Sequence, residues 1–146
     1  MPSGKTHDRL AWLTSPISAI SIYQATQSPD LAALGWVAHV FSGLYLSPDL
    51  DLQHSRPFKR WGILKVFWWP YAKAIAHRGI SHVPLLGTAT RLLWMAIAFW
   101  PVSYLLSRVY DAAWLCPGVW LFVALEIAAA THYVADSISS FIKKRR

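Results

Sequence analysis

Charged residues and cysteines are scarce in this chain of 146 residues. Asp, Glu, Lys and Arg make up 14% of it, whereas an ordinary soluble domain has about 25%. The length suits a single domain, residues 1–146, and leaves little room for a second. One cysteine, Cys116, cannot form an internal disulfide, so it reveals nothing about the redox compartment. The charged side chains are too few to cover the surface of a soluble protein of this size.

Apolar and aromatic residues are abundant in their place. Hydrophobic residues make up 55% of the chain, nine residues are tryptophan, and the mean hydropathy is +0.32. A soluble domain with an unusually apolar core is the alternative, but the shortage of polar surface argues against it. The composition therefore predicts an all-α, small helical integral membrane protein.

Four apolar segments stand out, at approximately residues 10–27, 31–47, 91–107 and 112–138. A bilayer core needs about 20 helical residues, so the fourth segment is long enough and the second and third are short. We expect the last two to form a membrane hairpin, and the first two a shorter hairpin that turns at residues 27–30. Whether the first two cross the bilayer completely stays open. Ser15 followed by Pro16 is typical of a helix start, and Pro101 is expected to kink the third segment.

The stretch between the second and third apolar segments, residues 48–90, contains PFKRWGILKVFWWPYAK, in which Lys and Arg are interleaved with Trp, Phe and Tyr. Aromatic rings favour the level of the lipid headgroups, where cations reach anionic phosphates. The same side chains can stack on nucleic acid bases. Beside strongly apolar helices, however, membrane lipid is the expected partner and nucleic acid is not. The stretch therefore predicts an interfacial segment.

The distribution of positive charge predicts an orientation. If the N-terminus, residues 47–91 and the C-terminus share one side of the membrane, that side holds every Lys and Arg of the 14 except Arg108. Cytoplasmic loops carry such an excess of Lys and Arg. We therefore expect a multi-pass protein of the inner or plasma membrane with both termini in the cytoplasm.

Four short polar clusters fall on this same cytoplasmic side, near the ends of the apolar segments. They are SGKTHDR with His7, SPDLDLQHS with Asp49 and Asp51, AHRGISHVP with His77, Arg78 and His82, and HYVAD with His132 and Asp136. Each cluster alone has an ordinary explanation: a solvated tail, a loop or helix cap, interfacial side chains, and a hydrogen bond within a helix, respectively.

The spacing within the clusters nevertheless suits a shared ligand. Asp49 and Asp51 follow a proline, and in an extended segment residues two apart point the same way. His132 and Asp136 are neighbours on one face of a helix. In AHRGISHVP, the glycine and the proline predict a turn in which both histidines can converge. Imidazoles and carboxylates together at the mouth of a helical bundle predict a divalent metal site, with zinc as the first expectation and manganese or iron as alternatives.

Two further ionisable residues lie inside apolar segments and are not expected to be metal ligands. His39 is predicted to be a packed or paired interior histidine. Glu126 is predicted to lie on a different helical face from His132.

The motifs, in this order, resemble the bacterial metal-binding proteins of the DUF2227 family over nearly the whole chain. The resemblance rests on SGKTHDR, GLYLSPDLD, RWGILKVFWWPYAKAIAHRGISHVPLLGT and the later helical His–Asp pair. It implies metal binding by His7, Asp49, Asp51, His77, His82, His132 and Asp136. The HRGISH core also resembles the wider group of YdjM-like (DUF457) membrane-bound metal-dependent hydrolases, which implies hydrolase chemistry.

Three functions are open on this evidence. The first is a metal-dependent hydrolase that cleaves a phosphoester at the cytoplasmic membrane surface, with Asp49, Asp51 and Arg78 as the catalytic candidates. The second is a non-catalytic protein in which the ion joins helix ends. The third, a transporter or channel, needs ionisable residues along the bilayer interior, where only His39 and Glu126 qualify. Pairing with a second copy of the chain, to form an oligomer, is compatible with all three.

Overall fold

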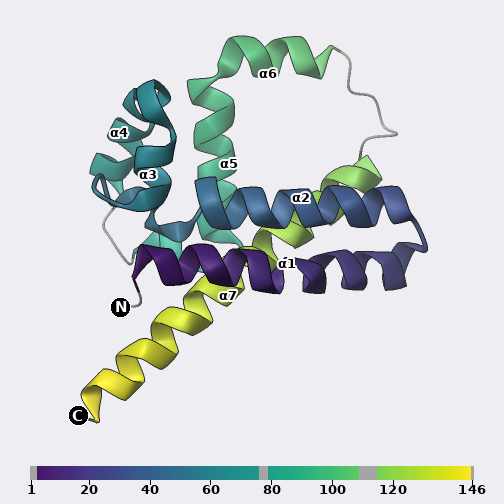
Figure 1. The fold of residues 1–146 in the computed structure, drawn as a ribbon. Helices are drawn as coiled ribbons and strands as arrows, with labels where there is room; N and C mark the ends of the chain where they lie inside the picture. Colours follow the sequence, from purple (N-terminus) through teal and green to yellow (C-terminus); the bar gives the residue numbers. More distant parts are fainter. Residues whose placement is uncertain (1–2, 76–78, 109–114, 146) are drawn as a thin grey trace.

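Helices form all the regular secondary structure in the part of the chain that the computed structural model describes, residues 3–75, 79–108 and 115–145 (Figure 1). The all-α prediction is therefore confirmed. In chain order the helices are α1 (Gly4–Thr26), α2 (Pro29–Tyr45), η1 (Pro48–Asp51), α3 (Arg56–Arg60), η2 (Gly62–Leu64), α4 (Lys65–Ala74), η3 (Ile80–His82), α5 (Leu86–Ala98), α6 (Trp100–Ser107) and α7 (Leu115–Lys144).

Helix α1 begins earlier than the Ser15–Pro16 pair predicts. The Ser3 hydroxyl accepts a hydrogen bond from a backbone N–H of the first turn and so caps the helix. Pro16 lies inside α1 and has no N–H to offer the Trp12 carbonyl. The Ser15 hydroxyl donates to that carbonyl instead, at 2.9 Å. The predicted start is therefore wrong, and the earlier start places His7 on a helix.

Helices α1 and α2 form an antiparallel hairpin that turns within residues 27–30, as predicted (Figure 1). Gln27 ends α1 in the left-handed region at φ 53°, and the Ser28 side chain caps α2. The two helices approach closely, because a Cβ at Gly43 would lie 2.4 Å from the Ala11 side chain.

His39 joins the two helices of the hairpin. Its ring nitrogens lie 2.6 Å from Ser18 Oγ and 3.0 Å from Thr14 Oγ1, and the residue is fully buried. The prediction of a paired interior histidine is confirmed. With both nitrogens hydrogen-bonded, the ring has none left for an ion.

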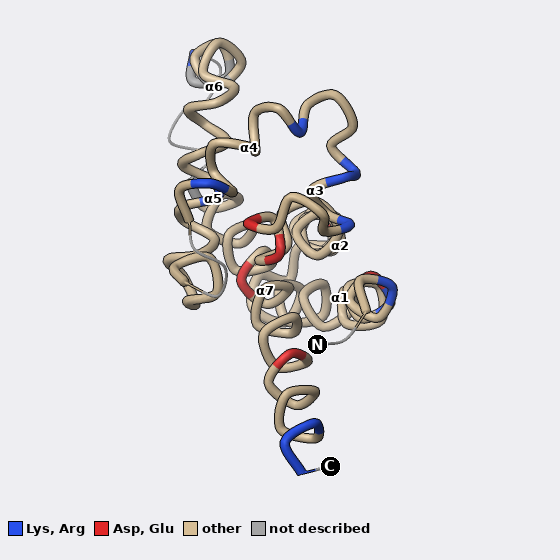
Figure 2. The backbone as a smooth tube through the Cα atoms, turned by 90° about the vertical axis from the view of Figure 1, so that its left-hand side faces the viewer, with Lys and Arg blue, Asp and Glu red and all other residues tan. Residues whose placement is uncertain are grey.

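Helix α7 crosses the hairpin and packs against both of its helices (Figure 1). The Ser42 hydroxyl of α2 donates to the Leu125 carbonyl of α7 at 3.2 Å. The C-terminal part of α7 extends beyond the hairpin, as both Figure 1 and Figure 2 show. The middle of α7 therefore lies beside the helix ends that carry the polar clusters.

A small apolar core covers the end of α2. Its buried members are Leu46, Leu50, Phe58, Trp68, Tyr71 and Leu125. The Trp61 indole N–H donates to the Tyr45 carbonyl at 3.0 Å. The Arg60 guanidinium donates to the Leu44 carbonyl at 2.9 Å. These bonds satisfy carbonyls that the end of a helix leaves without partners, and they anchor α3 beside η1.

The expected membrane segment at residues 91–107 is divided in two. Helix α5 ends at Ala98, Phe99 leaves the helical conformation (φ −109°, ψ 32°), and α6 begins at Trp100. Pro101, in the first turn of α6, lacks the N–H that would continue α5. The two helices run in different directions (Figure 1), so the proline region breaks the helix where a kink was expected.

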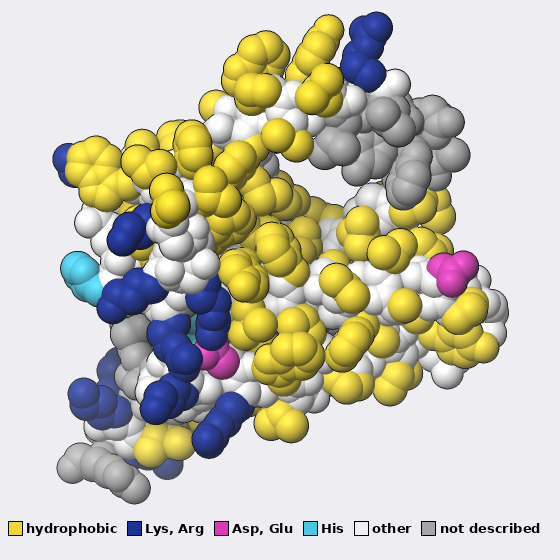
Figure 3. Space-filling view, turned by 45° about the horizontal axis from the view of Figure 1, so that its top comes forward, with side chains coloured by type: hydrophobic (Ala, Val, Ile, Leu, Met, Phe, Trp, Pro, Cys, Tyr) yellow, Lys and Arg dark blue, Asp and Glu magenta, His cyan; other side chains and the backbone are white. Residues whose placement is uncertain are grey.

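Two helical stretches, Pro29–Asp51 and Cys116–Lys144, are long and apolar enough to cross a bilayer, and α5 is apolar but shorter. Only 33% and 28% of their apolar windows are buried inside the protein. Large apolar side chains are exposed over much of the described surface (Figure 3), which is typical of a surface that contacts lipid or protein. The two helices are thus compatible with membrane association. Four crossing segments and their orientation stay predictions.

Candidate metal centre

Four elements that are distant in the sequence meet where the start of α1, the end of α2 and the middle of α7 come together. They carry the predicted ligands His7 (α1), Asp49 and Asp51 (η1), His82 (η3), and His132 and Asp136 (α7). Figure 2 shows acidic positions grouped beside α7, with Lys and Arg on α3 and at the end of α7. Two predicted site residues, His77 and Arg78, lie outside the described residues.

The closest group consists of Asp49, His82, His132 and Asp136, and one ligand atom from each lies within 4.8 Å of all the others. His132 Nε2 is 3.5 Å from Asp49 Oδ1 and 3.8 Å from Asp136 Oδ2. His82 Nε2 is 3.9 Å from Asp49 Oδ1. All four side chains are buried or nearly so, the most exposed being Asp49 at 12%. Two imidazoles and two carboxylates thus face one small volume, and this donor set suits a zinc, manganese or iron ion.

His7 brings a third imidazole to the group. Its Nε2 lies 3.3 Å from Asp136 Oδ1, and its ring stacks on the ring of His132 with centroids 3.9 Å apart. Burial and the neighbouring His132 lower the pKa of His7, and the attraction of Asp136 and Asp49 offsets only part of this effect. The ring is therefore neutral at pH 7, which is the form in which an imidazole binds a metal.

Six buried polar atoms of this group have no hydrogen-bond partner. They are both ring nitrogens of His7, Asp49 Oδ1, His132 Nε2, and both carboxylate oxygens of Asp136. Elsewhere in the described part of the chain, three buried side-chain atoms share this condition. An unsatisfied buried polar group costs about 1–3 kcal/mol, and a charged one costs more. A divalent cation would satisfy one ligand atom of each of these residues together, so the residues present fit the ion that they are predicted to bind.

Asp51 lies behind His82 rather than beside the unpaired atoms. The Ser81 hydroxyl donates to Asp51 Oδ2 at 2.6 Å, and its oxygen is 3.0 Å from His82 Nδ1. Because the serine proton goes to Asp51, the serine oxygen accepts from the Nδ1–H of His82, and the lone pair is left on Nε2. Such an arrangement orients a metal-binding histidine. Asp51 thus contacts His82 through Ser81 and lies outside the closest group. Its predicted role as a direct ligand and catalytic residue stays a prediction.

Ser47 gives His132 a similar support. Its Oγ is 3.3 Å from His132 Nδ1, so the opposite nitrogen, Nε2, faces Asp49. Sequence reasoning missed both supporting serines. The signal for Ser81 is its place directly before His82. No local signal exists for Ser47, because the histidine it contacts lies on a distant helix.

A family model matches most of the chain. The family is described as "Uncharacterized metal-binding protein (DUF2227)", and the match covers residues 2–117. The chain belongs to the DUF2227 family. The resemblance drawn from the motifs is therefore confirmed. Metal binding, the property in the description of the DUF2227 family, agrees with the group of His and Asp side chains in the structure.

The DUF2227 match includes His7, Asp49 and His82 but ends before the two ligands that α7 contributes. A relative from Aquifex aeolicus (strain VF5), described as "Uncharacterized protein", is 31% identical over 132 residues, which cover 74% of this chain and 91% of the relative. No solved structure matches the chain.

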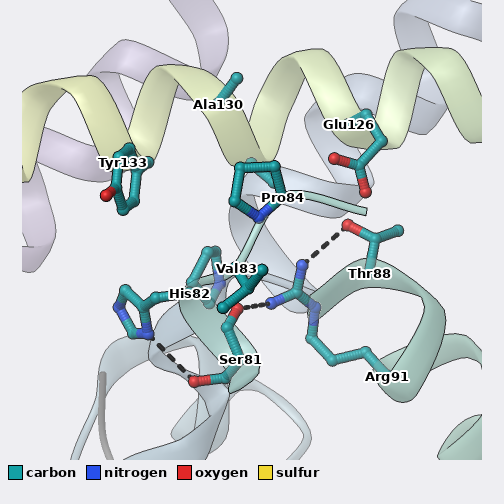
Figure 4. A pocket seen from close by; sticks show the side chains of 11 residues that line it. Ser81, His82, Val83, Pro84, Thr88, Arg91, Glu126, Ala130 and Tyr133 are labelled. Carbon is teal, nitrogen blue, oxygen red and sulfur yellow. Dashed lines mark hydrogen bonds between the residues drawn. The ribbon is translucent and has the colours of Figure 1, made fainter. Parts of the chain in front are cut away.

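Arg91 and Gly87 of α5 hold the turn that carries His82 in this DUF2227 protein. Arg91 is 1% exposed, and it donates to the Ser81 carbonyl and to Thr88 Oγ1, both at 3.0 Å (Figure 4). A Cβ at Gly87 would lie 2.3 Å from the same carbonyl. A glycine is therefore needed for α5 to approach the turn. The distribution of charge in the sequence predicts that Arg91 is one of the cations at the membrane surface, but in the structure this cation is buried.

Two cavities adjoin the metal group, the name used from here on for His7, Asp49, His82, His132 and Asp136. The smaller, of about 20 Å³, lies between η3, α5 and α7 (Figure 4). Glu126 lines it and accepts a hydrogen bond from the Leu85 N–H at 3.1 Å, apart from the metal group as predicted. The larger, of about 330 Å³, lies between η3 and α7, and both His82 and Asp136 line it. The metal group is therefore open on this side.

Proposed function

We propose that this protein is a membrane-embedded, metal-dependent hydrolase that cleaves a phosphoester at the cytoplasmic surface of the inner or plasma membrane. The observation that carries the proposal is the convergence of six buried ligand atoms of His7, Asp49, His132 and Asp136 that have no hydrogen-bond partner, beside a cavity of about 330 Å³. A structural metal site is closed by its protein ligands, whereas a catalytic site keeps a position open to water and substrate. An open cavity that His82 and Asp136 line supports the catalytic alternative.

The residues of the group would hold a divalent ion, with zinc expected first and manganese or iron as alternatives. When bound, such an ion supplies positive charge for the substrate oxygens and lowers the pKa of water toward about 7. Asp49, whose Oδ1 faces both His82 and His132, is the carboxylate placed to take a proton from water. Asp51 orients His82 through Ser81. Arg78 stays the predicted cation for the phosphate.

The membrane placement rests on two observations. Two described helical stretches are long and apolar enough to span a bilayer. Figure 3 shows most Lys and Arg gathered at one end of the molecule, with hydrophobic side chains over much of the rest. α1 begins, α2 ends and the metal group lies at the basic end, and the excess of Lys and Arg supports the proposal that this end faces the cytoplasm. Membrane lipid is therefore the proposed partner, and the substrate is a phosphoester at that surface.

Elemental analysis is the first test of the proposal. Protein purified in detergent is expected to contain a stoichiometric amount of zinc, manganese or iron. His82→Ala and Asp136→Ala should lose the metal. His54→Ala and Asp8→Asn are matched controls that should retain it, because His54 is exposed and Asp8 pairs with Arg56 and Arg60. Absence of metal from the parent protein after reconstitution would contradict the proposal at its base.

A phosphoesterase screen follows for the metal-loaded protein. Hydrolysis of a chromogenic phosphoester is expected in the parent and in His54→Ala. Asp49→Asn should reduce the rate by at least about 100-fold, since removal of a general base or metal ligand has effects of this size. Metal binding without hydrolysis of any phosphoester tested would favour the second candidate.

The second candidate is a non-catalytic metal-binding protein. One observation favours it: a single ion would join α1, η1, η3 and α7, and so would fasten elements that are distant in the sequence. In that case the metal would raise the unfolding temperature strongly while no substrate binds in the adjacent cavity.

A further inference from the structure

The cavity of about 330 Å³ has a distinctive wall. Three residues that carry hydroxyl groups line it from α7, namely Tyr133, Ser137 and Ser140. His82 and Asp136 line the same cavity and belong to the metal group, so one end of the cavity is the proposed metal site. A molecule in this cavity would therefore contact the hydroxyls and an ion at the same time.

The hydroxyls follow from the helical repeat of α7. Tyr133, Ser137 and Ser140 are spaced by four and three residues, which places them on one face of the helix. The neighbouring Ser139 turns to another side of α7, where it lines a separate, mostly apolar cavity beside α1. Figure 4 shows the Tyr133 ring projecting from α7 on the side of His82. One face of α7 thus continues from the metal group as a row of hydroxyl donors.

The charge of the wall limits what can bind there. None of the described residues that line this cavity is Lys or Arg, and its one carboxylate, Asp136, already faces His7 and His132. A cationic group would thus find no carboxylate to itself. Recognition of quaternary ammonium groups uses several aromatic rings around the cation, and among the described residues of this wall only Tyr133 is Phe, Tyr or Trp. Hydroxyls, by contrast, donate to phosphoryl oxygens and bond equally well to the hydroxyls of an uncharged alcohol.

We propose that this cavity is the substrate subsite for a phosphoryl group and the uncharged, hydroxyl-bearing alcohol esterified to it, such as a glycerol unit, and that it discriminates against choline and ethanolamine esters. The inference rests on the proposed function for its choice of a phosphoester. The hydroxyls of Tyr133, Ser137 and Ser140 bind the substrate, and a divalent ion held by the metal group would neutralise its charge. The same chemistry occurs in a soluble glycerol phosphate and in the headgroup of a lipid such as phosphatidylglycerol.

The test is a binding measurement that does not depend on turnover. Zinc-loaded protein in detergent is titrated with glycerol phosphate, with inorganic phosphate and with phosphocholine, by isothermal titration calorimetry. Glycerol phosphate is expected to bind at least about tenfold more tightly than phosphocholine, because two or three additional hydrogen bonds together lower the Kd by about this factor. Equal or tighter binding of phosphocholine, or no binding of glycerol phosphate, would overturn the inference.

Variants then locate the subsite. Tyr133→Phe removes one oxygen atom, and Ser137→Ala with Ser140→Ala removes two, so zinc content and helical circular dichroism should stay as in the parent. Each variant is expected to weaken glycerol phosphate binding by about threefold to tenfold or more. Ser139→Ala, on the other side of α7, is the matched control and should bind as the parent does. Unchanged affinity in both subsite variants would place the ligand elsewhere and overturn the inference.

The two sources of the ligand are separated by competition. Mixed micelles that contain phosphatidylglycerol should displace glycerol phosphate if the headgroup of a lipid is the ligand, and phosphatidylcholine micelles should not. If glycerol phosphate binds and neither micelle competes, a soluble ester is the ligand, and the subsite stands in both cases. Displacement by phosphatidylcholine micelles alone would overturn it. If the parent binds glycerol phosphate selectively but hydrolyses no phosphoester, the proposed function is wrong and this inference stands. If the parent hydrolyses a phosphoester but the subsite variants bind glycerol phosphate as the parent does, this inference is wrong and the proposed function stands.

Discussion

His132 Nε2 lies 3.5 Å from Asp49 Oδ1, and neither atom has a hydrogen-bond partner, although one residue belongs to α7 and the other to the turn after α2. The His132 ring has its other nitrogen beside Ser47 Oγ, where it can donate its proton. With that proton on Nδ1, both facing atoms would be lone-pair acceptors and would repel each other. A cation between them turns this repulsion into attraction, which is why the pair indicates a metal site more strongly than either residue alone.

Chelation should therefore destabilise the protein. A metal ion that binds only the folded state raises the free energy of unfolding by about 2.7 kcal/mol when free metal is at 100 times its Kd. Removing the metal with EDTA removes this stabilisation. The unfolding temperature of the parent should drop and should recover when zinc is added back. His132→Ala should show neither response. An unchanged unfolding temperature in the parent would mean that these atoms hold no ion.

Ser81→Ala tests the support of His82. Without the hydroxyl, Asp51 loses its hydrogen-bond donor and the His82 ring is no longer held with Nε2 toward the group. Metal affinity should drop about 10- to 100-fold, as it does when partners of metal-binding histidines are removed. Competition with a fluorescent chelator measures this. Ser139→Ala is the control, and equal affinity in the two variants would show that Ser81 has no part in orienting the ring.

Gly87→Ala tests the approach of α5 to the same turn. The new Cβ would lie 2.3 Å from the Ser81 carbonyl, so the turn must shift, at a cost of about 1–3 kcal/mol. Both the free energy of unfolding and the metal affinity should decrease. Gly118→Ala, on α7 with nothing within 4 Å of the new atom, should be neutral or stabilise by about 0.5–1 kcal/mol. Loss of stability in both variants alike would contradict the role assigned to Gly87.

His7 should make the metal-free protein sensitive to acid. Burial lowers its pKa in the folded state, while in the unfolded chain the pKa is about 6.5. The unfolded state therefore binds the proton more tightly, so stability decreases as pH falls below about 6.5 and this decrease stops below the folded pKa. Above about 6.5 the residue adds no pH dependence. Unfolding of EDTA-treated protein across this range should have a shallower slope in His7→Gln, and identical slopes would contradict the assignment.

Local interactions explain what could be predicted. The turn at residues 27–30 depends on Ser28 as a cap and on Pro29 behind it, and both are adjacent in the sequence. The pairing of His132 with Asp136 depends only on the helical repeat. The helix start predicted from Pro16 was wrong because a helix can continue through a proline when a nearby hydroxyl satisfies the carbonyl left without a partner, and Ser15 does so. The Trp36 indole of α2 donates to the same Ser15 hydroxyl, so this arrangement also involves packing between α1 and α2.

Contacts between distant segments explain what could not be predicted. Asp51 and Asp49 are two residues apart and look equivalent in the sequence, but η1 turns one toward Ser81 and the other toward His132. Ser47 and Arg91 carry no local signal of their roles, since each acts on a residue of another element.

The sequence by itself determined that the chain is helical and apolar, and that its positive charge lies at the two ends and in residues 47–91. It also determined which residue types are available for an ion. Composition, capping and helical periodicity decide these features within a few residues of chain. Only the tertiary structure decided which of those residues meet. The crossing of α7 over the hairpin brings His132 and Asp136 to His7, Asp49 and His82, and Tyr133, Ser137 and Ser140 of α7 line the adjacent cavity. The physical reason is that a ligand set depends on packing between helices, and each helix buries its face against partners far away in the sequence.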